Sequence, residues 1–62
     1  MVFLAVDEDG SEWMYEDLPE RNSGRWYIPE KSYGVCLRIP TGSIEKLIGV
    51  SIFWKDEPFR LS

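Results

Sequence analysis

Glycine and proline recur along the whole chain, and this spacing constrains the fold more than any other feature. They stand at Gly10, Pro19, Gly24, Pro29, Gly34, Pro40, Gly42, Gly49 and Pro58. The intervals between them are too short for long helices and fit short strands joined by turns. With 62 residues, the chain has the size of one small domain, which we place at residues 1–62.

Alternation of apolar and polar residues predicts where the strands lie. Residues 1–6 are wholly apolar and predict a buried strand, followed by a tight turn in which Gly10 adopts a positive φ. In residues 11–17, Trp13 and Tyr15 share one face, and Glu12, Met14 and Glu16 share the other, as expected of a strand with one face in solvent. Further strands are predicted at residues 25–28, 35–39 and 50–54, with residues 59–61 as a tail or edge strand and residues 18–24 as a polar connection.

One segment has a helical period. Ile44, Leu47 and Ile48 are spaced i, i+3 and i+4, Ser43 is available as N-cap, and Gly49 can end the helix. The sequence therefore predicts one short helix at about residues 43–49, before the last main strand. A helix this short does not form alone in water, so its apolar side is expected to cover the open end of a curled sheet.

The expected fold is mainly β, a small curved antiparallel sheet or barrel of five or six strands. Three features accompany it: an acidic loop (Asp7, Glu8, Asp9), an aromatic pair opening the third strand (Trp26, Tyr27), and a strand that ends at residues 39–40 before the helix. In this layout the chain resembles SH3-like barrels. SH3 domains read proline-rich ligands through tyrosines, and the matching residues 5–7 and 40–42 contain none. Residues 42–49 and 54–58 also resemble small uncharacterised proteins of phages and bacterial mobile elements.

The composition argues against catalysis. There is no histidine, the single cysteine is Cys36, and none of the serines lies in a Gly-x-Ser-x-Gly motif. The acidic loop fails as an EF-hand, because alignment on Gly10 puts Ala5 where the first aspartate should stand. We therefore expect no enzyme, no cofactor and no metal site.

The charges are ordered along the chain. Residues 1–20 contain seven acids and no base, whereas residues 21–62 have a net charge of +3, so that the total is -4. Such a run often serves only solubility, but it can also attract a cationic partner. Our preferred hypothesis is a non-catalytic protein-binding module, or a small inhibitor or accessory protein. The candidate partner-binding residues are Asp7, Glu8, Asp9, Glu12, Glu16 and Asp17.

An alternative hypothesis is single-stranded nucleic-acid binding, because cations alternate with aromatic residues in residues 21–38. The candidate nucleic-acid-binding residues are Arg25, Tyr27, Lys31, Tyr33 and Arg38. Against it, Trp26 and Ile28 match a buried face and the pI is near 4.6. A structural subunit of an assembly and a homodimer through an edge strand are further possibilities.

Nothing in the sequence indicates a membrane. The apolar residues 1–6 lack a basic n-region and a small-residue cleavage site, and no apolar stretch is long enough to cross a bilayer. A free Cys36 fits a reducing compartment. We therefore expect a cytoplasmic protein.

Overall fold

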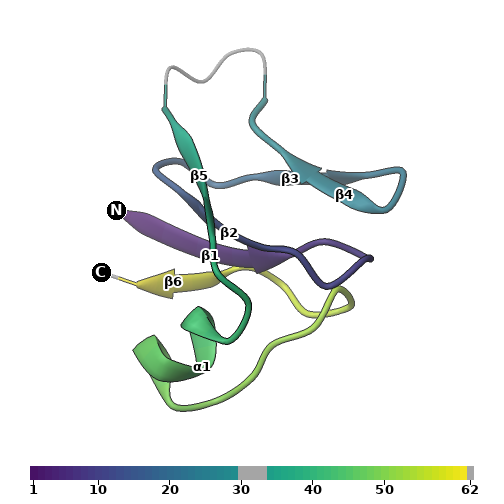
Figure 1. The fold of residues 1–62 in the computed structure, drawn as a ribbon. Helices are drawn as coiled ribbons and strands as arrows, with labels where there is room; N and C mark the ends of the chain where they lie inside the picture. Colours follow the sequence, from purple (N-terminus) through teal and green to yellow (C-terminus); the bar gives the residue numbers. More distant parts are fainter. Residues whose placement is uncertain (30–33, 62) are drawn as a thin grey trace.

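The computed structural model describes residues 1–29 and 34–61, and this part of the chain is mainly β (Figure 1). The elements in chain order are β1 (Val2–Val6), β2 (Glu12–Tyr15), β3 (Glu20–Asn22), β4 (Arg25–Tyr27), β5 (Cys36–Ile39), α1 (Ser43–Ile48) and β6 (Phe59–Leu61). The expected class, short strands with one short helix, is confirmed.

The strands form two antiparallel sheets. The larger has the order β5-β2-β1-β6, and β3 pairs with β4 in the smaller. The four-stranded sheet is not closed, so β5 and β6 are its two edges. In an antiparallel ladder, paired residues share a face of the sheet. Leu4, Met14 and Leu37 therefore lie on one face, and Ala5, Trp13 and Arg38 on the other.

Both faces of the larger sheet carry a small core. On the first, Leu4, Val6 and Ile44 are buried, with partly buried apolar side chains packed around them. On the second, Ala5, Tyr15 and Trp26 are buried, and Trp26 comes from the β3–β4 hairpin. The helix thus covers one face and the hairpin the other. Met14, which we predicted on a solvent face, packs against the first core, so that prediction is wrong.

The turn between β1 and β2 has the predicted form. The Gly10 amide donates to the Asp7 carbonyl at 2.9 Å, and Gly10 has a φ of 92°. The Ser11 amide donates to the Asp9 carboxylate at 2.9 Å. A β-turn followed by a left-handed glycine is a common three-residue hairpin loop.

The helix occupies nearly the predicted residues but begins differently. Gly49 ends it with a φ of 81°, as predicted. The N-cap is Gly42, which provides no side-chain cap, so the prediction of Ser43 is wrong. The Glu12 carboxylate instead accepts the Gly42 amide at 2.7 Å and the Ile44 amide at 2.9 Å. A strand residue therefore caps the helix.

Two strand predictions are corrected by the structure. Residues 50–54 contain no strand; they run irregularly from α1 toward β6. Conversely, the connection predicted at residues 18–24 contains β3. Its residues are all polar, so no alternation marked it. A two-residue turn with positive φ at Ser23 (52°) and Gly24 (79°) forces the hairpin with β4.

Candidate functional site

The six candidate acidic residues do not form one surface, because two of them have internal roles. Asp7 is buried at 6% exposure, and its carboxylate accepts the Trp26 amide at 2.9 Å. Glu12 is half-buried and caps α1. Both side chains join distant parts of the fold. This leaves Glu8, Asp9, Glu16 and Asp17 as exposed candidates.

The exposed acids lie at opposite ends of β2. Glu8 and Asp9 occupy the turn before this strand, whereas Glu16 and Asp17 follow it. An extended chain rises about 3.4 Å per residue, so the two pairs are separated by roughly 17 Å or more. The structure therefore brings Glu8 and Asp9 together but not all six.

The turn of Glu8 and Asp9 faces a shallow groove. The groove has a volume of about 280 Å³, and its lining residues come from the β1–β2 turn and the loop before β6. They are Val6, Asp7, Glu8, Gly10, Phe53, Trp54 and Lys55. Figure 1 shows the two segments side by side. We call Glu8, Asp9 and Phe53, with this groove, the acidic–aromatic end.

Phe53 is unusually exposed for an aromatic residue, at 68%. Its loop is nevertheless held in place. The Phe53 amide donates to the Asp56 carboxylate at 2.7 Å, and the Asp56 amide donates to the Phe53 carbonyl at 2.9 Å. The Arg21 guanidinium donates to the carbonyls of Trp54 (2.7 Å) and Asp56 (2.9 Å). The exposed ring thus stands on an ordered loop.

Arg21 also lies between two tryptophan rings. Its guanidinium carbon is 4.6 Å from the ring centroid of Trp26 and 4.7 Å from that of Trp54. The two rings meet edge to face at 5.8 Å. A guanidinium over an aromatic face is attracted to it electrostatically. Arg21 therefore fastens the loop before β6 to the β3–β4 hairpin.

The electrostatics of the acidic turn favour a charged Asp9 carboxylate. The Ser11 amide, which donates to the Asp9 carboxylate, lowers the pKa of Asp9, and the charge of Arg38 adds to this effect. Asp9 therefore keeps its negative charge in mildly acidic solution as well as at neutral pH.

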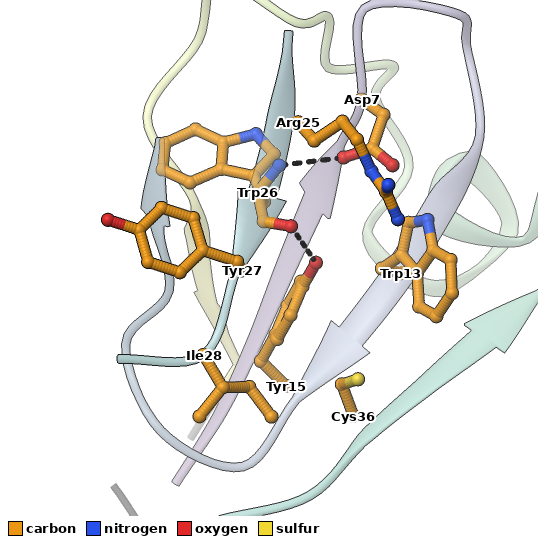
Figure 2. A pocket seen from close by; sticks show the side chains of 8 residues that line it. All are labelled: Asp7, Trp13, Tyr15, Arg25, Trp26, Tyr27, Ile28 and Cys36. Carbon is orange, nitrogen blue, oxygen red and sulfur yellow. Dashed lines mark hydrogen bonds between the residues drawn. The ribbon is translucent and has the colours of Figure 1, made fainter. Parts of the chain in front are cut away.

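A second candidate site is an aromatic pocket of about 250 Å³ on the hairpin side of the larger sheet (Figure 2). Its lining residues are Asp7, Trp13, Tyr15, Arg25, Trp26, Tyr27, Ile28 and Cys36. Figure 2 shows the Arg25 side chain reaching from beside Asp7 toward the indole of Trp13. A cation, a carboxylate and several rings thus share this pocket.

One polar group of the pocket has no acceptor. The indole nitrogen Nε1 of Trp13 is buried, and nothing in residues 1–29 or 34–61 accepts a hydrogen bond from it. By contrast, the Tyr15 hydroxyl donates to the Trp26 carbonyl at 3.3 Å. Burial, reinforced by the charge of Asp7, raises the pKa of Tyr15 well above its usual value. Tyr15 therefore stays neutral in the folded protein.

The nucleic-acid candidates are partly brought together. Arg25 and Tyr27 line the aromatic pocket, and Tyr27 is 41% exposed. Its hydroxyl donates to the Glu20 carboxylate at 3.1 Å, which raises the pKa of Tyr27. Arg38 lies on the same face of the sheet, opposite Trp13. Lys31 and Tyr33 lie outside the described residues.

Sequence reasoning missed Phe53, Trp54 and Arg21 as parts of a site. The alternation of Val50, Ile52 and Trp54 resembles a strand, and it concealed the loop. A usable signal was the run of turn-forming residues at 55–58, directly after Trp54. Nothing local marked Arg21 as a link to this loop, because its hydrogen-bond acceptors there are more than 30 residues away in sequence.

The described residues contain neither a metal-binding cluster nor a membrane-spanning helix. Within the described part of the chain, no group of three or more histidine, cysteine or acidic residues could hold a metal ion. No helix among the described residues is long and apolar enough to cross a membrane. The chain matches no protein-family model, no curated protein and no solved structure, so its own residues carry the functional argument.

Proposed function

We propose that this protein is a non-catalytic protein-binding module that docks on a basic partner through the acidic–aromatic end. The observation that carries the proposal is Phe53, a large apolar side chain left 68% exposed on an ordered loop beside an acidic turn. Interface hot spots are typically large side chains in the centre of a patch, surrounded by polar residues.

Order in the loop supports this role. Binding costs less when the contacting side chain is already held in place. Asp56 and Arg21 fix the backbone on both sides of Phe53, so docking need not order this loop first. The groove beside Phe53 offers space for an apolar side chain of the partner.

The charges indicate the chemistry of the partner. Glu8 lines the groove, and Asp9 follows it in the same turn. Asp56 and Glu57 stand on the loop that carries Phe53, where Lys55 and the Arg21 guanidinium supply the opposite charge. A cluster of negative charges attracts a positively charged surface. It raises the association rate more than it raises the affinity. The fitting partner is a protein with a basic patch around an apolar pocket.

The test is affinity capture from the cells that make the protein, comparing the wild type with Phe53→Ser. Leu47→Ser is the matched control, because Leu47 is 51% exposed on α1, away from the groove. We expect a basic protein that the wild type and the control retain and Phe53→Ser loses. The rate at which this basic protein associates with the wild type should fall as the salt concentration rises. Identical capture by all three forms would refute this docking surface.

A second candidate function has one observation in its favour. The Arg25 guanidinium, a hydrogen-bond donor, shares a pocket with the ring of Tyr27, which is 41% exposed. An unstacked nucleobase offers acceptors for such donors and a ring to stack on Tyr27. This candidate requires single-stranded DNA or RNA to bind below about 10 μM at moderate salt, and steeply weaker at high salt. Tyr27→Ala should then lose most of the binding.

Two broader predictions belong with these proposals. Kinship with SH3-like barrels is supported by two antiparallel sheets that share a core around Trp26, and an experimental structure tests it. A cytoplasmic location is supported by the exposed free thiol of Cys36, and fractionation of the producing cells tests it.

A further inference from the structure

The two edges of the larger sheet differ in what they offer to another strand. Edge strands carry backbone N–H and C=O groups without a partner, and such groups pair readily with a further strand. In this sheet the edges are β5 and β6 (Figure 1). Which backbone groups point outward follows from the hydrogen-bond pattern of each ladder.

On β5, the outward residues are Cys36 and Arg38. The Glu16 amide donates to the Val35 carbonyl at 3.0 Å, so Glu16 and Val35 form a hydrogen-bonded pair between β2 and the start of β5. Hydrogen-bonded and non-hydrogen-bonded pairs alternate along an antiparallel ladder. Counting from Val35, the backbone groups of Leu37 and Ile39 therefore bond inward to β2. The N–H and C=O groups of Cys36 and Arg38 therefore point away from the sheet.

On β6, the same reasoning leaves one outward residue. Along β1, alternate residues direct their backbone hydrogen bonds to β2 and to β6. The hydrogen-bonded pairs between β1 and β6 are therefore Val2 with Leu61 and Leu4 with Phe59. Only Arg60 in the middle of this three-residue strand points outward. The β5 edge is thus the better template.

The β5 edge is also the more apolar one. Val35 and Leu37 are 68% and 62% exposed, and they lie on the same face of the sheet. With Val2 and Met14 they line an apolar groove of about 220 Å³. Exposed apolar side chains next to unpaired backbone groups are what natural edge strands usually avoid.

We propose that β5 pairs antiparallel with β5 of a second copy of this chain, about a two-fold axis at Leu37. In this register, Cys36 exchanges two backbone hydrogen bonds with Arg38 of the second copy, and the reverse pair adds two more. Leu37 faces Leu37 of the second copy, and Val35 faces Ile39. The result is a continuous eight-stranded sheet with an apolar ladder across the junction.

The sequence of β5 selects this register among the two-fold alternatives. An axis at Arg38 would oppose two arginines directly, which is destabilising, and would pair Cys36 with Pro40, which has no N–H. An axis at Cys36 would pair Arg38 with Gly34, beyond the first residue of β5. Only the axis at Leu37 keeps both outward residues paired within the strand.

Charge complementarity supports a second copy as the occupant. The Asp17 carboxylate lies over Gly34, because a Cβ placed there would be 2.7 Å from Asp17 Oδ2. In the proposed register, Arg38 of the second copy lies diagonally across from Gly34, within reach of this carboxylate. Arg38 also acts electrostatically on Asp9 of its own chain. Each Arg38 would thus lie near one acid of its own chain and one acid of the second copy.

The expected dimer is weak, since one strand and a few apolar side chains bury less than a standard interface. We expect sedimentation equilibrium at pH 7 to show a monomer at about 10 μM and a growing dimer fraction toward about 1 mM. Leu37→Lys should weaken the association at least tenfold, while Leu47→Lys, equally charged and remote from β5 on α1, leaves it unchanged. A monomer at every concentration, or equal association by both variants, overturns the proposal.

A disulfide experiment tests the register. Leu37→Cys in a Cys36→Ser background should give a covalent dimer on mild oxidation, because directly paired Cα atoms lie within disulfide range. The native Cys36 should not cross-link, since the axis at Leu37 separates the two Cys36 Cα atoms by more than about 7 Å. Rapid cross-linking through native Cys36 would overturn the register, and circular dichroism of each variant checks that it is folded.

Discussion

Removing the Glu12 carboxylate should release the start of α1. Glu12 accepts the amides of Gly42 and Ile44 at 2.7 and 2.9 Å from a half-buried position. A hydrogen bond to a charged group contributes about 1.5–3 kcal/mol, and the lower figure suits a site that water can reach. Glu12 accepts two such bonds, so for Glu12→Ala we expect the free energy of unfolding to fall by about 3 kcal/mol. A domain of this size has only roughly 3–9 kcal/mol in total.

Urea denaturation followed by circular dichroism and tryptophan fluorescence measures this change. Glu57→Ala is the matched control, because Glu57 is an exposed glutamate and forms no hydrogen bond within residues 1–29 and 34–61. The control should alter the free energy of unfolding by less than about 0.5 kcal/mol. Glu12→Gln should fall between the two, since its amide oxygen still accepts without a charge. Equal stability of Glu12→Ala and the control would refute capping by the strand.

Three further changes test the internal contacts. Asp7→Ala leaves the buried Trp26 amide without its acceptor, and urea unfolding should show a loss of about 1–3 kcal/mol; an unchanged midpoint would contradict this. Arg21→Ala should change tryptophan fluorescence and speed proteolysis of the loop around Trp54, because its contacts to both rings and to that loop are lost; unchanged spectra and cleavage would argue against it. The raised pKa of Tyr15 means that the folded state holds this proton while the unfolded state releases it above about pH 10. Stability should therefore fall as pH rises beyond 10, and Tyr15→Phe should remove this component of the slope; an unaltered slope would exclude Tyr15 as its source.

Local patterns predicted the elements whose partners lie nearby or whose alternation is strong. The apolar residues 1–6 and the turn ending at Gly10 gave β1 and the hairpin to β2. The 3.6-residue spacing and Gly49 gave the helix and its end. In each case burial of one face and a positive φ act within a few residues, so the sequence carries the information locally.

The errors came from interactions between distant residues. Ser43 has the chemistry of an N-cap, but a carboxylate 30 residues earlier occupies the helix start. The residues 50–54 alternate like a strand, yet β1 already pairs with β2 and with β6. No position next to β1 remains for them. The hydrophobic pattern and the strand propensity of a segment do not show whether another segment already occupies its place in the sheet.

The acidic block shows the same limit for the candidate site. Seven acids in residues 1–20 suggest one negative surface, but β2 separates the acids at its two ends, and Asp7 and Glu12 are directed into the fold. Their carboxylates join the first hairpin to Trp26 and to α1. Arg21 makes a third such link, to the loop of Phe53. In a chain with one cysteine and a thin core, these charged links perform the task that disulfides have in many domains of this size. Part of the charge that looked available for a partner therefore stabilises the fold, and Phe53 with the two acids of the turn remains exposed as the docking surface that we propose.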